Sequence, residues 1–368
     1  MNRSNPTVVV TDWAFPDLGV EEEILKAHGV ELIARQCKTE AELIELCAEA
    51  DAIITQFARV NANVVSAMRK ARAIVRYGIG VDNVDLERAR ERGIPVCNVP
   101  DYCIDEVADQ TLAFILATTR QVVTHTNHLR AGKWGLTTPV AGMKALRDLT
   151  VGVVGFGRIG REVVKRLMPF KCGVLVFDPV VPAIEVEKLR ARAVSFEEVL
   201  RKADVLTLHC PSTAQTRRLM NRDTFAKLKP GAIFINVGRG DLADPDALTA
   251  ALQSGHLGAA ALDVFDPEPI PSGHPLLLMP NVLLTPHIAS CSVPAVKKLR
   301  ESAPGRRHRI WPPPRDGPAS RWSRQSRERR SRCDPLAAHQ RQPRPAPGPS
   351  RVPCLGPHRS RGQLCQRG

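Results

Sequence analysis

Short apolar runs alternate with amphipathic stretches from Thr7 to Val99. The runs TVVVT, VELIARQ, DAIIT, AIVRYG and IPVCNV have the apolar and β-branched content of strands. Between them lie VEEEILKAHG, TEAELIELCAEA, NANVVSAMRKA and NVDLERARERG, which have apolar residues at helical spacing. Gly29 and Gly93 stand where glycine closes a helix, and Pro95 follows the second of them. Strands that alternate with helices predict a parallel sheet.

The same alternation returns from Leu149 onward, after a different kind of segment. Asp105 to Thr119 is apolar on more than one side, which predicts a long buried helix joining two lobes. A second helix is predicted from Gln121 to Ala131, followed by an irregular stretch with Trp134 that could form an arm or a lid. The pattern predicts an α/β chain with two doubly wound parallel-sheet lobes. In such folds ligands bind in a crevice at the carboxyl ends of the strands.

The segment from Val151 to Pro179 carries G-x-G-x-x-G between an apolar run and a helical stretch. Gly155 permits the tight turn, Gly157 lets the backbone approach a pyrophosphate, and Gly160 lets the helix pack closely on the strand. N–H groups at the start of that helix would face the phosphates. The strand, the glycines and the helix together indicate a dinucleotide site rather than a chance turn.

An acidic residue at the end of the next strand completes this fingerprint. Asp178 follows the apolar run GVLVF and stands 18 residues after Gly160. Its carboxylate would accept hydrogen bonds from the ribose hydroxyls of NAD and would repel a 2′-phosphate. The sequence therefore predicts NAD as the cofactor, with NADP disfavoured.

Charge is distributed unevenly between the body and the C-terminal tail. The formal net charge is +14, but residues 1–302 hold 36 basic and 35 acidic residues, whereas residues 303–368 hold 16 arginines and three acidic residues. The tail also has 12 prolines and no lysine, so it cannot bury enough apolar surface to fold alone and is predicted to be disordered. It could be a basic arm for nucleic acid or anionic lipid, an inert extension, or the product of a shifted reading frame in GC-rich DNA, which we favour.

The cysteines and the N-terminus indicate the compartment. Ten cysteines are scattered without a C-x-x-C pair, so neither a disulfide framework nor a zinc site is predicted. The apolar run near the N-terminus is too short for a signal peptide, and no stretch approaches the roughly 18 apolar residues of a membrane span. We expect a cytoplasmic protein with no membrane segment and no bound metal.

Three polar residues follow strand-like runs in the second lobe: Arg239, Glu268 and His287. Taken singly, each also fits an ordinary loop or turn, but the three would meet at one edge of a parallel sheet. His287 is the candidate proton donor, because imidazole titrates near neutral pH. Glu268 would orient that ring and favour its charged form, and Arg239 would offer a planar fork to a carboxylate. Beside a nicotinamide, this set suits the reduction of a keto group next to a carboxylate.

The motifs GFGRIG, INVGRGDL, ALDVFDPEP and LLTPHIAS, in this order, resemble those of the D-isomer-specific 2-hydroxyacid dehydrogenase family over about residues 7–302. The resemblance implies a flavodoxin-like substrate-binding domain over 1–103, to which 288–302 returns, and a Rossmann NAD-binding domain over 104–287. It also implies a homodimer, a small 2-keto or 2-hydroxy acid as substrate, and the roles given above for Arg239, Glu268 and His287.

The resemblance further assigns binding residues. For the cofactor these are Gly155, Gly157, Arg158, Ile159, Gly160, Asp178, Cys210, Val237, Gly238 and Asp263, the last of which would hold the carboxamide. In the family, the loop that matches RYGIGVDN gives backbone N–H groups to the substrate carboxylate. The expected substrate-binding residues are therefore Arg76, Tyr77, Gly78, Ile79, Gly80 and Arg239, although a plain strand-to-helix turn would also explain the two glycines.

The subfamily is less sharply defined. YGIGVDNVDL and GIPVCNVPDYCIDEVADQTLAF are similar to the phosphoglycerate dehydrogenase-like and C-terminal-binding-protein-like branches. The second branch includes NAD-sensing corepressors, so an NADH-responsive scaffold with little turnover is the alternative function. Animal corepressors have a tryptophan shortly after the histidine, where this chain has Ser290 and Cys291, which favours an enzyme.

The chain departs from the family after His287. In relatives a helix begins there and packs back on the substrate-binding domain. Here Val293 to Ser302 begins such a helix, and Pro304 and Gly305 then stop it. We therefore expect the returning element to be missing and an apolar patch on the first lobe to be uncovered.

Overall fold

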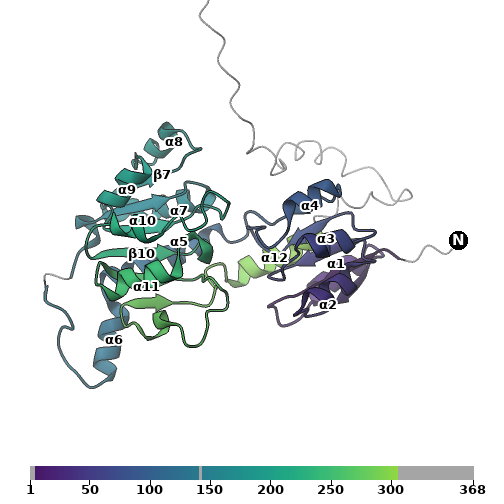
Figure 1. Cartoon of the computed structure of the whole chain (residues 1–368), viewed down its shortest axis with the longest axis horizontal. Helices are drawn as coiled ribbons and strands as arrows, with labels where there is room; N and C mark the ends of the chain where they lie inside the picture. Colours follow the sequence, from purple (N-terminus) through teal and green to yellow (C-terminus); the bar gives the residue numbers. More distant parts are fainter. Residues whose placement is uncertain (1–4, 141–142, 306–368) are drawn as a thin grey trace, which may run out of the picture. The chain divides into compact units, whose positions relative to one another are not determined.

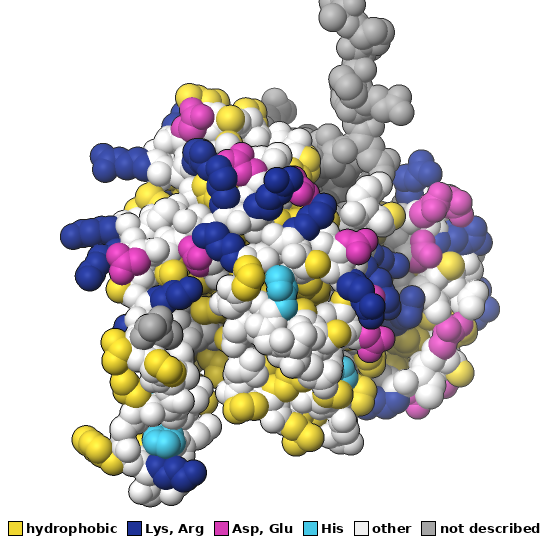
Figure 2. All heavy atoms as spheres, turned by 60° about the vertical axis from the view of Figure 1, so that its left-hand side comes forward, with side chains coloured by type: hydrophobic (Ala, Val, Ile, Leu, Met, Phe, Trp, Pro, Cys, Tyr) yellow, Lys and Arg dark blue, Asp and Glu magenta, His cyan; other side chains and the backbone are white. Residues whose placement is uncertain are grey.

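The computed structural model describes residues 5–140 and 143–305 (Figure 1). The predictions for the Arg- and Pro-rich tail, including its disorder, its possible origin in a shifted reading frame and its possible contact with nucleic acid, concern residues 306–368 almost entirely and lie outside the described residues. On the face shown in Figure 2, basic and acidic side chains are interspersed. This fits the balance of charges in residues 1–302.

The first lobe is built on a five-stranded parallel sheet in the order β2-β1-β3-β4-β5, the flavodoxin-like arrangement. Its strands are β1 (Thr7–Val10), β2 (Glu31–Ala34), β3 (Ala52–Thr55), β4 (Ile74–Arg76) and β5 (Val96–Cys97). Its helices are α1 (Gly19–Lys26), α2 (Glu40–Cys47), α3 (Ala62–Ala67) and α4 (Leu86–Glu91). Each strand predicted between Thr7 and Val99 is present.

The second lobe is built on a seven-stranded parallel sheet in the order β12-β11-β10-β9-β6-β7-β8. Its strands are β6 (Thr150–Val154), β7 (Gly173–Phe177), β8 (Arg192–Ala193), β9 (Val205–Leu208), β10 (Ala232–Asn236), β11 (Leu257–Leu262) and β12 (Val282–Leu284). The order reverses at β6, which carries the glycine-rich loop, as in a Rossmann sheet. The prediction of two parallel-sheet α/β lobes is confirmed.

The remaining helices cover this second sheet or connect to it. They are α5 (Ile104–Thr119), α6 (Val122–Arg130), α7 (Arg158–Leu167), α8 (Ala183–Glu187), α9 (Phe196–Lys202), α10 (Arg222–Ala226), α11 (Pro245–Gln253), and the short 3-10 helices η2 (Leu146–Asp148), η3 (Met168–Phe170), η4 (Gly240–Leu242) and η5 (Pro275–Leu278). α5 packs against α7, β10 and β11, and eight of its sixteen residues are buried, as the sequence predicted.

The last described helix, α12 (Val293–Gly305), packs against α1 of the first lobe (Figure 1). Leu299 and Ala303 join the core that includes Val8 and Val10. The prediction that the returning element is missing is therefore wrong for the described part of the chain. The physical reason is that the anchoring side chains all lie ahead of Pro304, and Pro304 itself is still within the helix, in its last turn.

One ion-pair cluster fixes α12 in place. The Arg300 guanidinium lies 2.8 Å from Glu21 Oε2 and 2.9 Å from Asp17 Oδ1. Glu21 is fully buried, and Arg300 also lies over the ring of Phe15. A buried carboxylate needs such a partner, because an unpaired buried charge is strongly destabilising.

Candidate active site

The glycine-rich loop after β6 has the geometry that the fingerprint predicts. Gly155 has φ +97°, and a Cβ on it would lie 2.6 Å from the backbone nitrogen of Cys210. A Cβ on Gly160 would lie 2.1 Å from the carbonyl oxygen of Gly155, so only glycine allows α7 this close to the loop. A Cβ on Gly157 would meet nothing within 4 Å. The loop is therefore closed on its inner side and open where Gly157 faces outward.

The start of α7 lies at that open side. Gly157 is the N-cap and, within the described residues, no side chain caps the helix, so the first-turn N–H groups can bind a ligand. Arg158 is exposed, with Nη1 3.4 Å from the carbonyl oxygen of Pro100. Ile159 packs against the core of the second lobe. These features suit a pyrophosphate.

Asp178 stands at the end of β7 and ties the loop to the neighbouring strand. Its Oδ2 accepts a 2.7 Å hydrogen bond from the backbone N–H of Phe156, and its Oδ1 accepts bonds from the N–H groups of Val180 and Val181. The carboxylate is thereby fixed beside the glycine loop, where the sequence placed it for the ribose.

The ends of β9 and β10 bring Cys210, Val237 and Gly238 to the same sheet edge. Burial raises the pKa of the Cys210 thiol to about 11, so the thiol is neutral at physiological pH. The neighbouring His209 bonds to the Thr207 hydroxyl at 3.0 Å, and burial lowers its pKa to about 3. His209 is therefore not a second source of protons near neutral pH.

The predicted acid pair is formed directly. His287 Nδ1 lies 2.5 Å from Glu268 Oε1, and the two side chains are 25% and 34% exposed. His287 has a left-handed backbone with φ +52°, a conformation that a non-glycine residue keeps only when its surroundings hold it. The pair leaves Nε2 of His287 without a partner among the described residues.

Asp263 supplies the hold on the His287 turn. This fully buried residue accepts hydrogen bonds through its carboxylate from the Thr285 hydroxyl at 2.5 Å and from the N–H groups of Ile288 and Ala289, both at 2.9 Å. Its backbone carbonyl accepts the N–H of His287 at 2.9 Å. All these partners belong to the turn around His287. This supporting role was not predicted, and the predicted contact with the cofactor carboxamide stays a prediction.

Arg239 is the third member of the predicted catalytic set and is held from two sides. Its Nε donates to Asp82 Oδ1 at 2.9 Å, and its Nη1 donates to the carbonyl oxygen of Gly238 at 2.8 Å. A Cβ on Gly80 would lie 1.7 Å from its Nη2. The guanidinium of the second lobe is thus brought directly onto the loop that was predicted to bind substrate.

Arg76 lies on the opposite side of the same loop. It is buried, and its Nε donates to the carbonyl oxygen of Gln56 at 3.2 Å. A Cβ on Gly78 would lie 1.3 Å from its Nη1. Burial and the charge of Arg239 both lower the pKa of Arg76. Two guanidinium groups therefore flank one glycine-containing loop, which favours an anion there.

Some of the backbone N–H groups in that loop are already hydrogen-bonded within the protein and are not available to a substrate. The N–H of Tyr77 bonds to Thr55, and the N–H of Gly78 bonds to Arg76. The Tyr77 hydroxyl donates to buried Glu21 at 3.2 Å, so this side chain points into the core under α12. Tyr77 has no free donor to offer. Within residues 5–140 and 143–305, the N–H groups of Ile79 and Gly80 have no partner and remain for a carboxylate.

Comparison with known proteins decides the family. Residues 112–289 match the model of the D-isomer specific 2-hydroxyacid dehydrogenase NAD binding domain. Hydroxypyruvate reductase of Thermotoga maritima is 35% identical over 262 residues, which cover 70% of this chain and 84% of that protein. The chain belongs to the D-isomer specific 2-hydroxyacid dehydrogenase family.

Other members of the family differ in length. D-3-phosphoglycerate dehydrogenase of Archaeoglobus fulgidus is 36% identical over 269 residues, which cover 73% of this chain and 51% of that protein. The chain spans about half the length of such relatives. The crystal structure of D-lactate dehydrogenase of Aquifex aeolicus, complexed with NAD and lactic acid, superposes with a TM-score of 0.73 at 26% identity, over 81% of this chain and 93% of that one.

Three further residues of this chain lie beside the candidate active site and were not predicted from the sequence. Phe57 follows β3, is 49% exposed, and meets the His287 ring edge to face with centroids 5.8 Å apart. Asp12 at the end of β1 accepts the N–H groups of Gln56 and Phe57 at 3.0 and 2.5 Å and so fixes that loop. Asp82 bonds Arg239. Asp12 and Phe57 each stand two residues after a strand and Asp82 stands in the loop after β4, positions that by themselves give no sequence signal for a site.

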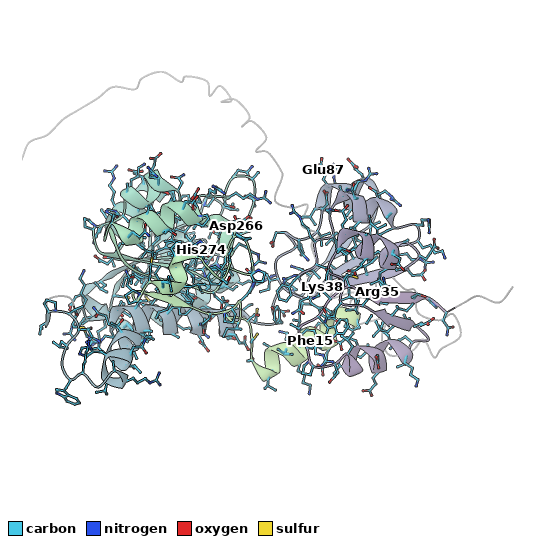
Figure 3. The ribbon with its side chains drawn as sticks, turned by 60° about the horizontal axis from the view of Figure 1, so that its bottom comes forward. Phe15, Arg35, Lys38, Glu87, Asp266 and His274 are labelled. Carbon is cyan, nitrogen blue, oxygen red and sulfur yellow. The ribbon has the colours of Figure 1, made fainter. Side chains whose placement is uncertain are left out.

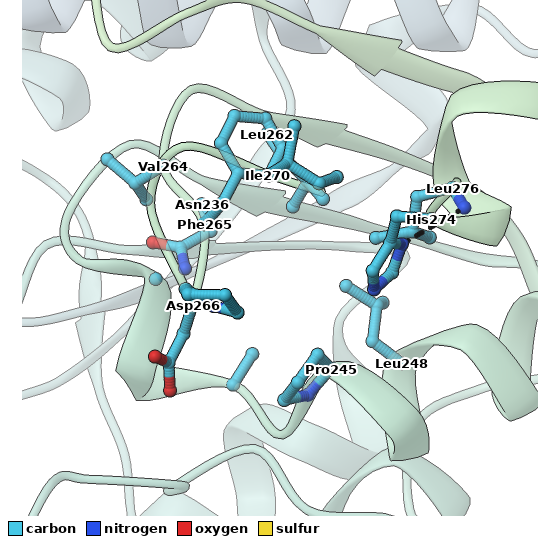
Figure 4. A pocket seen from close by; sticks show the side chains of 13 residues that line it. Asn236, Pro245, Leu248, Leu262, Val264, Phe265, Asp266, Ile270, His274 and Leu276 are labelled. Carbon is cyan, nitrogen blue, oxygen red and sulfur yellow. Dashed lines mark hydrogen bonds between the residues drawn. The ribbon is translucent and has the colours of Figure 1, made fainter. Parts of the chain in front are cut away.

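A small pocket is lined by Gly240, by side chains of the loop between β11 and β12, and by residues of β10 and α11 (Figure 4). Asp266 and His274 come from that loop (Figure 3) and stand on its rim. Its volume is about 30 Å³, room for about one water molecule. Arg239, Glu268 and His287 do not line it, so it is not part of the candidate active site.

Three further findings concern membrane-spanning helices, metal sites and cysteines. No helix in the described part of the chain is long and apolar enough to cross a membrane. Among residues 5–140 and 143–305, His, Cys, Asp and Glu form no group that could hold a metal ion. Among the described cysteines, Cys291 is the exposed one.

Proposed function

We propose that this chain is an NAD-dependent oxidoreductase that interconverts a 2-keto acid and a D-2-hydroxy acid. The observation that carries the proposal is the Glu268–His287 pair, which stands with Arg239 at the carboxyl edge of the sheet that also bears the glycine loop. The strands β10, β11 and β12 are adjacent and parallel, so the three residues that follow them share one edge. Acid, orienting carboxylate and anion-binding arginine are the groups that carbonyl reduction requires.

The residues of the glycine loop fit NAD. The outward face of Gly157, the free N–H groups at the start of α7 and the Asp178 carboxylate would hold the pyrophosphate and the adenosine ribose. Cys210, Val237 and Gly238 would line the rest of the cofactor site. When bound, NADH supplies the hydride that reduces the keto carbon. The Asp178 carboxylate disfavours NADP.

His287 would deliver the proton to the keto oxygen. Glu268 holds Nδ1 in a hydrogen bond, so the N–H at Nε2 is the donor that faces the substrate. Proton transfer from Nε2 to the oxygen produces the hydroxyl group of the product. In the reverse direction Nε2 takes the hydroxyl proton back. The hydrogen bond to Glu268 keeps the ring in one orientation in both directions.

The substrate carboxylate would bind at the loop between Arg76 and Arg239. The free N–H groups of Ile79 and Gly80 point to the same carboxylate as Nη2 of Arg239. Bidentate binding to a planar guanidinium fixes the position of the neighbouring keto group, which a lysine could not do as well. The substrate class is therefore a small 2-keto or 2-hydroxy acid.

We propose the domain division 1–103 with 288–302 for substrate and 104–287 for cofactor, and a homodimer as the assembly. α6 and the stretch after it support the dimer, because α6 buries none of its residues and large apolar side chains there are exposed, notably Trp134 at 91%. Exposed apolar surface of this kind marks an interface. Sedimentation of the full chain measures the oligomeric state. A cytoplasmic location stays a prediction.

The test is NADH oxidation by the purified chain with glyoxylate, hydroxypyruvate, pyruvate, 2-ketogluconate and phosphohydroxypyruvate. His287→Ala should lower turnover by roughly 100- to 10,000-fold while NADH affinity stays unchanged, because a placed proton donor contributes about that much. His28→Ala, at an exposed residue just after α1, is the matched control and should retain full turnover. NADH binding with no turnover on any acid would instead support the scaffold function.

A further inference from the structure

Asp82 stands beside the arginine of the proposed site and has no role in the catalytic set. It follows Gly80 in the loop after β4, and its Oδ1 accepts a 2.9 Å hydrogen bond from Nε of Arg239. The two residues are 157 positions apart in the chain and come from different sheets. The carboxylate of the first lobe thus meets the guanidinium of the second.

The contact uses only one edge of the guanidinium. Nε is taken by Asp82, and one Nη1 hydrogen is taken by the carbonyl oxygen of Gly238. Within the part of the chain that the structure describes, the two Nη2 hydrogens and the second Nη1 hydrogen have no partner, and a Cβ on Gly80 would lie 1.7 Å from Nη2. These remaining donors face the same loop as the free N–H groups of Ile79 and Gly80. The bond to Asp82 therefore leaves the carboxylate-binding end of Arg239 open.

The negative charge of Asp82 also acts on the two arginines around the loop. Arg76 and Arg239 are close enough that Arg239 lowers the pKa of Arg76, and Asp82 acts in the opposite direction. Partial burial raises the pKa of Asp82, but the charge and hydrogen bond of Arg239 outweigh this and hold that pKa below its ordinary value. One negative charge thus offsets two like charges around the loop, and Asp82 remains ionised at neutral pH.

We propose that Asp82 is a positioning residue that fixes Arg239 by its Nε edge, so that the outer edge of the guanidinium and the Ile79–Gly80 amides grip one carboxylate. The inference rests on the proposed function, because it assigns the substrate carboxylate to this loop. Without Asp82, Arg239 keeps, among the described residues, only its bond to the Gly238 carbonyl oxygen, and the repulsion from Arg76 moves it away. A misplacement of about 1 Å can lower catalysis on the order of 100-fold.

The experiment compares Asp82→Asn with Asp223→Asn, a change at an exposed aspartate whose carboxylate makes no hydrogen bond within the described residues. Asp82→Asn should raise KM for the keto acid roughly 10- to 100-fold, lower kcat less, and leave the melting temperature and NADH affinity unchanged. Asp82→Glu should restore part of the loss. Asp223→Asn should change nothing.

A double-mutant cycle with Arg239→Ala separates positioning from a general structural role. Binding of oxamate to the NADH complex is the readout, because it needs the carboxylate site but no turnover. If Asp82 acts through Arg239, its substitution weakens oxamate binding in the parent chain but not in the Arg239→Ala background. Equal effects in both backgrounds, or an unchanged KM in Asp82→Asn, would overturn the inference.

The two proposals fail in different ways. A parent chain that binds NADH and oxamate but reduces no keto acid refutes the proposed reaction, and the oxamate cycle still judges Asp82. If the parent chain does not bind oxamate, the proposed carboxylate site is wrong, and both the proposed function and the role of Asp82 are overturned. If Asp82→Asn does not fold, Asp82→Ser replaces it in the same cycle.

Discussion

The two lobes build their parts of the proposed site by different means. In the second lobe the backbone fixes where the site residues lie, through a glycine turn, the start of a helix and three neighbouring strand ends. In the first lobe the site depends on side-chain contacts, with Arg76 held by Gln56, the Phe57 loop held by Asp12, and Asp82 bound to Arg239. Side-chain contacts of the kind found in the first lobe are hard to predict from a sequence pattern, because the partners are distant in the chain.

This difference predicts different consequences of substitution. Changes to the glycine loop should affect cofactor binding through space and backbone geometry. Changes in the first lobe should affect the keto acid, or the stability of the fold, through lost partners. The following predictions test that contrast.

Two glycine substitutions in one loop should differ in their effect on stability. Gly157→Ala places its Cβ where nothing lies within 4 Å, so the fold should keep its melting temperature while the methyl group blocks the phosphates. The loss of charged hydrogen bonds should weaken NADH binding on the order of 10- to 100-fold. Gly160→Ala meets the backbone of Gly155 at 2.1 Å and should lower the melting temperature as well. Calorimetry and NADH fluorescence measure both; equal melting temperatures in the two variants would refute the backbone account.

The first lobe should respond most to the loss of Arg300. Arg300→Met leaves Glu21 buried without its cation, and a broken buried pair destabilises by about 3–5 kcal/mol. Lys297→Met on the exposed face of α12 is the matched control and should change stability little. Urea denaturation followed by circular dichroism measures the difference. If both variants unfold at the same urea concentration, α12 is not anchored as described.

The smallest expected effect concerns the thiol of Cys210. Its pKa is raised to about 11, so the protein prefers the neutral thiol; the stability that this preference contributes is complete below the ordinary thiol pKa and is lost as pH rises towards 11. At pH 8 iodoacetamide should modify exposed Cys291 and leave Cys210 unmodified, with mass spectrometry of the peptides as the readout. Modification of Cys210 as fast as Cys291 would show that the end of β9 is open.

The sequence was sufficient for the second lobe and only partly for the first. Periodicity and the G-x-G-x-x-G spacing placed β6, α7 and Asp178, and the strand ends placed Arg239, Glu268 and His287. Composition was misleading at the C-terminus: Pro304 indicated an aborted helix, yet Leu299, Arg300 and Ala303 dock α12 before it.

What the sequence did not predict has a physical cause. Tyr77 lies within the motif of the substrate loop, but strand alternation turns its side chain into the core, where it meets Glu21. Asp82, Asp12 and Phe57 act through contacts between distant segments, which local pattern does not encode. Asp263 was assigned to the cofactor, but only the structure shows that its carboxylate holds the His287 turn.

Hydride transfer is the central claim, and transfer of deuterium tests it most directly. The chain would be incubated with NADH deuterated at C4 on either face and with hydroxypyruvate or pyruvate, and the product analysed by chiral chromatography and mass spectrometry. The account predicts a D-2-hydroxy acid that carries deuterium at C2 from one of the two NADH forms, and little product from His287→Ala. An L-product, or NADH that binds without passing deuterium to any 2-keto acid, would contradict it.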